Sequence, residues 1–257
     1  MAGLKGSRRW DVLPQDAEAA SKLGNALDVP PLVARVMCAR GIRDVEEAKR
    51  FLTPSLDRDW QDPLLIPGMK EAADRVEAAL ERGEQIAVFG DFDVDGMSAT
   101  CLLTLGLRAL GGKVAPFIPN RFGEGYGLSR EALARVQEKA SPDLIVTVDN
   151  GIAAKNEVAW LKEEGIDVVV TDHPEPGDRV PAGVAVPAPR MTEDCPSRDL
   201  AGAGVALKLV QVLGERLGNP DLWRHYTEVA TLGTISDMMD LCGENRALVT
   251  DGLERMR

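Results

Sequence analysis

The stretch that decides the fold is QIAVFGDFDVDGMSATCLLTLGLRAL, residues 85–110. It opens with the short apolar run QIAVFG, which predicts a buried strand, and apolar residues at helical spacing then predict a helix over 97–110. Three acids, Asp91, Asp93 and Asp95, stand between the two elements. The order strand, acidic turn and helix is typical of the first part of a βαβ unit.

The same alternation continues on both sides of this stretch. Helices are predicted over MKEAADRVEAALERG, which ends at Gly83, and over 129–139 and 153–164. Further apolar runs predict strands at KVAPFI, LIVTVD and DVVVTD, and AGVAVP is a candidate for one more. We therefore predict an α/β fold of αβα type: a mostly parallel sheet with helices on both faces.

The chain changes character near residue 68. Residues 1–68 form a predicted helical segment, interrupted by prolines, that ends in an irregular connector. Residues 69–257 form the predicted α/β domain, whose last part, 201–257, has a helical pattern. The last helix stops at Arg257 without a tail, so we expect a further C-terminal domain to be missing.

The composition restricts the class of protein. The chain is 44% hydrophobic but only 4% aromatic, which predicts an aliphatic core. A net charge of −11 argues against binding nucleic acid over the whole surface, although it leaves room for a local basic groove. The four cysteines are scattered, as is typical of reduced thiols in a cytosolic protein, and no apolar run is long enough to span a membrane.

Acidic side chains and one histidine follow the predicted strands. Three acids follow the first strand, Asp149 follows LIVTV, and Asp172 and His173 follow DVVVT. A further acid, Asp237, ends an apolar helix. Because ligands bind at the carboxyl ends of strands in open parallel sheets, we expect these side chains to gather at one edge.

Carboxylates gathered in this way repel one another unless cations bind between them. Oxygen ligands with a single imidazole favour Mn²⁺ or Mg²⁺, and two such ions are typical of phosphoester hydrolysis. Taken alone, DFDVDG also fits part of a calcium loop, Asp149 also fits a helix N-cap, and His173 also fits a structural role. The joint placement favours the metal site.

With these residues in place, the sequence resembles the DHH phosphoesterases, and among them the bacterial RecJ-type exonucleases specific for single strands. The family's motifs resemble, in order, GDFDVDGMSAT, VTVDNGI, VVVTDHPEPG and LGTISDMMDLCGENRALV. Signatures of the RecJ type lie between them at IPNRFGEGYGLS and LAGAGVALKL. The resemblance extends over nearly the whole chain.

The resemblance implies roles for particular residues. The metal-binding and catalytic positions of the family fall on Asp91, Asp93, Asp149, His173 and Asp237, with Asp149 as the bridge between two Mn²⁺ or Mg²⁺ ions. The nucleic-acid-binding loop of the family falls on IPNRFGEGYG. There Arg121 would contact a phosphate and Tyr126 would stack on a base, although a surface arginine and a packed tyrosine also fit these positions.

The chain departs from the family at three positions. Pro174 stands where the family has its second histidine, a donor or acid beside the scissile phosphate, and proline has no side-chain donor. Ala188 replaces an asparagine and Asp240 replaces a proline. The loss of one catalytic donor or acid typically slows a reaction by about a hundred- to ten-thousandfold.

The resemblance implies a metal-dependent 5′-to-3′ exonuclease that acts on single-stranded DNA in repair and recombination. Such an enzyme would lie in the cytoplasm, at the nucleoid, with DNA and other repair or replication proteins as partners. Pro174 keeps open a second interpretation, a catalytically impaired protein that binds DNA or acts as a scaffold. A third is a DHH phosphatase of oligonucleotides or cyclic dinucleotides.

Overall fold

The computed structural model describes residues 16–120, 127–173 and 180–257. The chain forms two compact units, Met1–Pro54 and Ser55–Arg257, each with its own core. Three residues discussed above, Arg121, Tyr126 and Pro174, lie outside the described residues.

The first unit has three helices in its described part: α1 (Ala17–Leu27), α2 (Pro31–Ala39) and α3 (Val45–Leu52). Leu23, Ala34 and Ala48 are fully buried in its small core. The helix starts follow from capping: the Asp44 carboxylate, for example, accepts hydrogen bonds from two backbone N–H groups of the first turn of α3. The helical pattern of this part of the sequence is confirmed.

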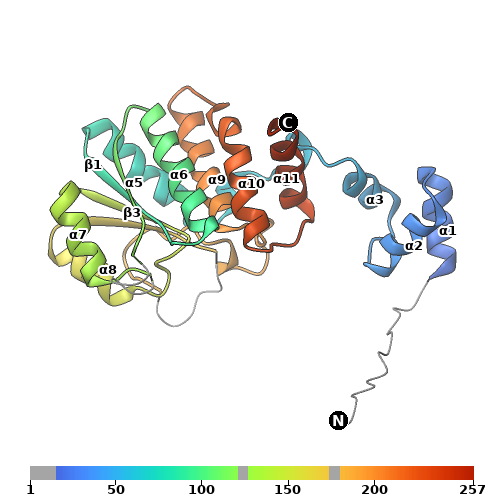
Figure 1. The fold of residues 1–257 in the computed structure, drawn as a ribbon, viewed down its shortest axis with the longest axis horizontal. Helices are drawn as coiled ribbons and strands as arrows, with labels where there is room; N and C mark the ends of the chain where they lie inside the picture. Colours follow the sequence, from blue (N-terminus) through green and yellow to red (C-terminus); the bar gives the residue numbers. More distant parts are fainter. Residues whose placement is uncertain (1–15, 121–126, 174–179) are drawn as a thin grey trace, which may run out of the picture. The chain divides into compact units, whose positions relative to one another are not determined.

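The second unit alternates strands and helices (Figure 1). Its strands are β1 (Gln85–Phe89), β2 (Lys113–Phe117), β3 (Leu144–Val148) and β4 (Asp167–Thr171). The longer helices are α5 (Met69–Arg82), α6 (Val94–Ala109), α7 (Arg130–Ala140), α8 (Lys155–Glu163), α9 (Gly202–Arg216), α10 (Thr227–Ser236) and α11 (Gly243–Arg255). Short helical turns are α4 (Leu56–Asp59), η1 (Pro63–Leu65), η2 (Pro189–Met191) and η3 (Leu222–Tyr226).

The four strands in the described part of the chain are parallel, in the order β2-β1-β3-β4. The predicted parallel α/β sheet is therefore confirmed. The stretch AGVAVP makes one isolated bridge, between Val169 and Ala185, and no full strand. Pro187, at its end, has no N–H group to continue a ladder.

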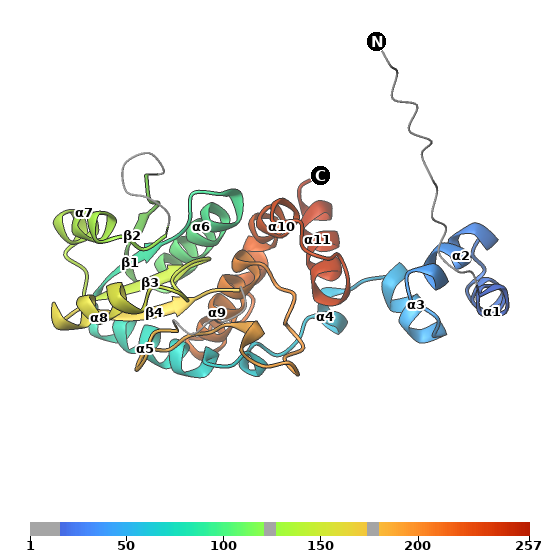
Figure 2. The ribbon, with the colours of Figure 1, turned by 90° about the horizontal axis from the view of Figure 1, so that it is seen from below.

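Helices cover both faces of the sheet (Figures 1 and 2). On β1, Ile86 and Val88 belong to the core shared with α5, α6 and α9, whereas Ala87 and Phe89 belong to the core shared with α7 and α8. This alternation is the period of two expected of a strand. Because most side chains of β1, β3 and β4 are covered, these strands are mostly apolar runs in the sequence.

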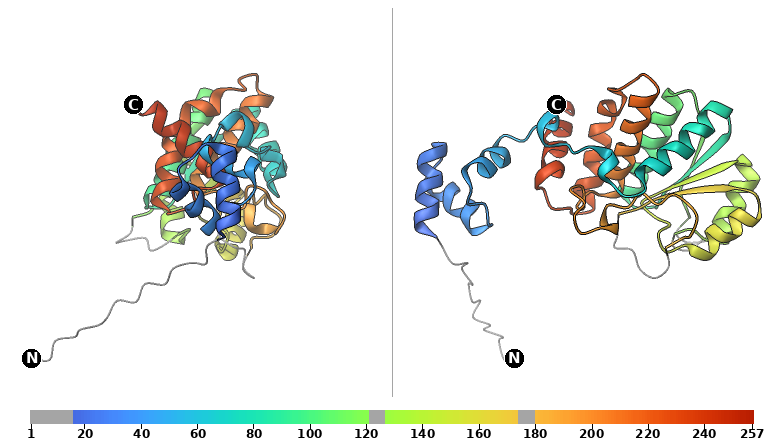
Figure 3. Two further views of the ribbon diagram at one scale, coloured as in Figure 1. Left: turned by 90° about the vertical axis from the view of Figure 1, so that its right-hand side faces the viewer. Right: turned by 180° about the vertical axis from the view of Figure 1, so that it is seen from behind.

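The last helices lie beyond α6 on one side of the sheet. Figure 3 (right) shows the orange and red helices α9, α10 and α11 grouped at the end of the second unit opposite the yellow-green α7 and α8. Helix α9 is buried over most of its length, and α10 packs against both α6 and α9. None of the described helices has the length and apolar character needed to cross a membrane.

The connector 55–68 belongs to the second unit, whereas the sequence pattern predicts a boundary at residue 68. Trp60 stacks on Trp223 with ring centroids 5.5 Å apart. The ammonium of Lys208 lies 3.7 Å from the Trp60 ring centroid and 2.6 Å from a carboxylate oxygen of Glu244. Burial lowers the pKa of Lys208 to about 8, against the opposing effect of Glu244.

Candidate metal centre

The acidic residues predicted at the strand ends do lie at one edge of the sheet. Strands β1, β3 and β4 are neighbours and run parallel, so their carboxyl ends meet. Asp91 follows β1, Asp149 follows β3, and His173 follows β4 by two residues. The arrangement matches the rule that sites form outside the carboxyl ends of parallel strands.

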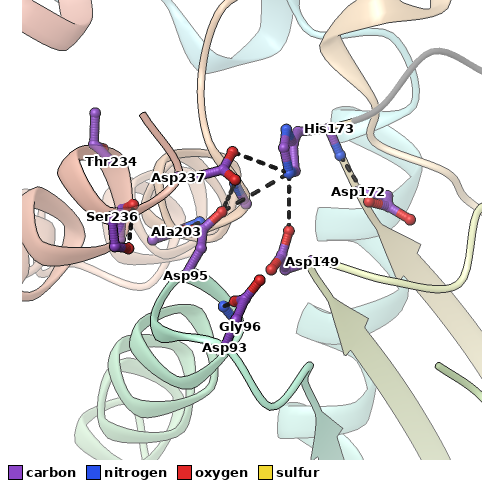
Figure 4. A network of polar contacts seen from close by, with 12 residues as sticks. Asp93, Asp95, Gly96, Asp149, Asp172, His173, Ala203, Thr234, Ser236 and Asp237 are labelled. Atoms are coloured by element: carbon purple, nitrogen blue, oxygen red, sulfur yellow. Dashed lines mark hydrogen bonds and ion pairs between the residues drawn. The ribbon is translucent and has the colours of Figure 1, made fainter. Parts of the chain in front are cut away.

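His173 lies at the centre of a group of carboxylates (Figure 4). Its Nε2 atom is 3.0 Å from Oδ1 of Asp149, 3.6 Å from Oδ2 of Asp237 and 3.9 Å from Oδ2 of Asp95. Residues 95, 149, 173 and 237 come from α6, the end of β3, the end of β4 and the end of α10. Four elements far apart in the sequence thus supply one cluster.

The ligand atoms form two adjoining groups. In one, Asp95, Asp149 and His173 offer ligand atoms that all lie within 4.8 Å of one another. In the other, Asp91, Asp93 and Asp149 do the same. Asp149 belongs to both groups, which is the position that a bridging carboxylate needs.

Asp95 belongs to the cluster, although it is not among the metal ligands predicted from the sequence. The helix predicted over 97–110 begins earlier, at Val94, because the Asp93 side chain accepts a hydrogen bond from the Gly96 N–H group and caps it. Asp95 therefore lies in the first turn, 1% exposed, on the inner face. The signal available in the sequence was the third acid of the D-x-D-x-D-G run.

The N-terminus of α9 holds Asp95 in place. Its Oδ2 atom accepts a hydrogen bond of 2.7 Å from the Gly202 N–H group, and its Oδ1 atom accepts one of 2.9 Å from the Ala203 N–H group. The positive end of a helix stabilises a carboxylate charge. Asp95 is thereby kept in one orientation beside His173.

Two glycines leave the space that the carboxylates occupy. A Cβ atom at Gly202 would lie 2.5 Å from the Asp149 Cβ atom and 2.6 Å from its Oδ1 atom. A Cβ atom at Gly233, in α10, would overlap Oδ1 of Asp95. The close approach of α9 and α10 to the cluster therefore requires glycine at both positions.

Asp149 has a left-handed backbone, with φ of 57°. The turn that follows is held by the Thr147 hydroxyl, which donates a 2.8 Å hydrogen bond to the Asn150 carbonyl, and by Gly151 at φ 104°. A left-handed conformation is uncommon for residues other than glycine, and such strain concentrates at functional sites. Here it turns the Asp149 carboxylate toward His173.

The cluster carries more negative than positive charge. Among the described residues, His173 is the only cation that forms ion pairs with Asp95, Asp149 and Asp237. Burial opposes protonation of His173, but the hydrogen bond to Asp149 and the neighbouring carboxylates prevail and raise its pKa to about 9. Burial raises the pKa of Asp149 to about 8 and also raises that of Asp95.

These features fit a divalent cation. Buried carboxylates that share a single imidazole are stabilised when a cation replaces the proton between them. A set of carboxylate oxygens with one imidazole nitrogen suits Mn²⁺ or Mg²⁺. Asp95, Asp149 and His173 would hold one ion, with Asp237 beside them, and Asp91, Asp93 and Asp149 would hold a second.

Asp172 has a structural environment, although it stands next to His173. Its Oδ2 atom accepts a 3.0 Å hydrogen bond from the Ile152 N–H group, and its Oδ1 atom accepts one from the His173 N–H group. Its carboxylate points away from the His173 imidazole (Figure 4). It therefore fixes the loops after β3 and β4 relative to each other.

Comparisons with known proteins agree with this geometry. Residues 85–234 match the DHH family, N-terminal domain. The chain is 40% identical over 256 residues to the single-stranded-DNA-specific exonuclease RecJ of Bacillus subtilis, covering 99% of this chain and 32% of that protein. It is 42% identical over 250 residues to RecJ of Thermus thermophilus, covering 96% of this chain and 35% of that protein.

Solved structures of RecJ proteins are also similar to this chain. The crystal structure of RecJ in complex with Mn²⁺ from Thermus thermophilus has a TM-score of 0.78 and 38% identity, covering 95% of this chain and 34% of that one. A crystal structure of exonuclease RecJ bound to manganese has a TM-score of 0.68 and 45% identity, covering 74% and 48%. The chain spans about a third of the length of the RecJ proteins of Bacillus subtilis and Thermus thermophilus. Because the family model matches more than half of it, the chain belongs to the DHH family.

Proposed function

We propose that the chain is the catalytic part of a Mn²⁺- or Mg²⁺-dependent exonuclease that degrades single-stranded DNA from its 5′ end. The observation that carries this proposal is the pair of carboxylate groups that share Asp149 at the carboxyl ends of the strands. The likeness to RecJ exonucleases over nearly the whole chain supports the same substrate class.

The chain's own residues would hold and orient the reacting groups. When bound, two divalent cations activate a water molecule and neutralise the charge that develops on the phosphate oxygens. Asp149 would bridge them, and His173 with Asp95 and Asp237 would complete one site. Asp91 and Asp93 would complete the other.

The substrate strand would be held next to these ions. We propose that Arg121 contacts a phosphate and Tyr126 stacks on a base; both residues lie outside the described ones. The protein would act in the cytoplasm, at the nucleoid, in repair and recombination. Other repair or replication proteins would be its partners there.

A second candidate function is DNA binding with little or no turnover. The observation that favours it is Pro174, which stands where the family's second histidine is expected. Proline supplies neither a hydrogen-bond donor nor a proton beside the scissile phosphate. The metal ligands would then serve binding, and the rate would be lower by about a hundred- to ten-thousandfold.

The test is Mn²⁺-dependent release of nucleotides from a 5′-phosphorylated single strand. The exonuclease proposal would be supported if the chain releases nucleotides, if Asp149→Ala abolishes this release and if Asp167→Ala retains it. Asp167 is a suitable control because it is an acid at the start of β4, at the end of the strand away from His173. A silent chain whose Pro174→His variant is active, or which binds the strand without cleaving it, would support the second candidate. A chain that neither binds nor cleaves would contradict both.

A further inference from the structure

Helix α10 ends in a left-handed residue that is not glycine. After the helix, the Met238 N–H group donates to the Ile235 carbonyl at 3.1 Å and the Met239 N–H group donates to the Thr234 carbonyl at 3.3 Å. These are the two hydrogen bonds of a Schellman cap, in which the left-handed residue is usually glycine. Here it is Met238, with φ of 53°.

Burial of the Met238 side chain does not compensate for this strained backbone. The residue is 89% exposed, the highest value among the large hydrophobic residues of the described chain. Glycine would relieve the strain without loss of buried contacts. Backbone strain of this kind motivates a hypothesis of function.

Met238 directly follows Asp237, whose Oδ2 atom lies 3.6 Å from His173 Nε2 in the candidate metal centre. Ile235, two residues before the same acid, is exposed on α10, and Val94 and Met97 are exposed in the first turn of α6, before and after the buried Asp95 in the sequence. The two helices pack against each other where Gly233 meets Asp95. We call these four residues, Val94, Met97, Ile235 and Met238, the apolar rim.

The apolar rim differs in chemistry from the acids beside it. None of its four side chains carries a charge or a hydrogen-bond donor, although the chain has a net charge of −11. A nucleotide has the complementary division: an anionic phosphate at one end and a base with flat apolar faces at the other. Proteins hold unstacked bases between aromatic or apolar side chains.

We propose that the apolar rim contacts the base of the nucleotide whose phosphate lies at the acidic cluster, with Met238 packed on the face of that base. This inference rests on the proposed function and adds to it a subsite for the base. The thioether of Met238 is flexible and polarisable, so the contact would accept any of the four bases. Contact with the face of a base also requires that the base is unstacked from a neighbour, which single strands allow more readily than duplexes.

The test compares two 5′-phosphorylated strands of equal length, one of thymidylate and one of abasic sites, both with phosphorothioate linkages that slow cleavage. Binding of each to the 257-residue chain in Mn²⁺ is measured by fluorescence anisotropy. We expect Met238→Gly to weaken binding of the thymidylate strand by about tenfold and to leave the abasic strand unchanged. The same variant should raise the melting temperature by about 2–4 °C.

The matched control is Ser141→Gly, which relieves a left-handed backbone (φ 43°) at the end of α7. It should raise the melting temperature and leave binding of both strands unchanged. Met97→Ser, which has no backbone strain to relieve, should weaken binding of the thymidylate strand only.

Four results would overturn the inference. Unchanged binding of the thymidylate strand by Met238→Gly and Met97→Ser would exclude a base contact while leaving the exonuclease proposal intact. An equal loss of affinity for the thymidylate and abasic strands would show that the substitutions act on phosphate binding at the acidic cluster and not on a base. A change of molecular mass in these variants, measured by light scattering, would make the rim an interface between copies. A chain that binds neither strand would contradict this inference and the proposed function together.

Discussion

Substitution of Gly202 by alanine should disable the candidate metal centre while the fold survives. The added methyl group would lie 2.5 Å from the Cβ atom and 2.6 Å from the Oδ1 atom of Asp149. Ordinary contacts between carbon atoms are about 3.5–4.0 Å, so one side must move by about 1 Å. Gly202 opens helix α9, whose first N–H groups also hold Asp95, and both carboxylates would shift.

The size of the effect follows from this displacement. Ligand distances at a metal must be correct to within about 0.2 Å, and changes beside the ligands typically cost 10- to 100-fold in metal affinity. A misplacement of about 1 Å costs about 100-fold in rate. Overpacking of this kind should lower the free energy of unfolding by about 1–3 kcal/mol, which leaves the chain folded.

The assay is calorimetric titration with Mn²⁺, together with thermal unfolding of each variant. Gly106→Ala is the matched control, because its methyl group would lie 2.8 Å and 2.9 Å from the two γ-carbons of Val210, between α6 and α9 but away from the acids. We expect a similar loss of stability in both variants and a loss of Mn²⁺ affinity only in Gly202→Ala. Unchanged Mn²⁺ affinity in Gly202→Ala, or an equal loss in Gly106→Ala, would refute the reasoning.

Three further predictions concern charge and capping. Lys208→Met should lower the free energy of unfolding in urea by about 3–5 kcal/mol, because it leaves the buried carboxylate of Glu244 without its ion-pair partner; a loss below about 1 kcal/mol would contradict this. Because the folded-state pKa values of His173 (about 9) and Asp149 (about 8) lie above their usual 6.5 and 3.8, the metal-free protein binds more protons when folded. Its melting temperature should therefore fall as pH rises from 6.5 to 9. Saturating Mn²⁺ should reduce this dependence of the melting temperature on pH. The same dependence with and without Mn²⁺ would disprove the link to these two groups. Asp44→Ala should lower the stability of the first unit by about 1 kcal/mol, seen as faster amide hydrogen exchange in α3, and unchanged exchange would show that the cap is dispensable.

The strands could be predicted because their sequence pattern is local. Each of β1, β3 and β4 is a mostly apolar run, as expected of a parallel strand that is covered on both faces. The local pattern is less informative at the start of α6. The sequence predicts a start at residue 97, whereas the helix begins three residues earlier, at Val94. The run DFDVDG offers three acids that can cap a helix, and the local pattern does not select Asp93 among them.

The candidate site could be predicted only in part. Asp149 and His173 were placed together because parallel neighbours bring their carboxyl ends to one edge. Asp95 was missed because its orientation depends on N–H groups of residues 202 and 203, more than a hundred positions away. The environment of Asp172 likewise depends on the Ile152 N–H group.

By itself, the sequence determined the order of strands and helices, the kinds of residue at the strand ends and the resemblance to the DHH family. These follow from interactions among residues a few positions apart, which repeat with the period of a strand or a helix. Only the tertiary structure decided that Asp95 faces His173, that glycines admit α9 and α10 to the cluster, and that Met238 stands exposed beside it. The physical reason is that these relations depend on how distant helices pack, and the local pattern carries no information about the distances between them.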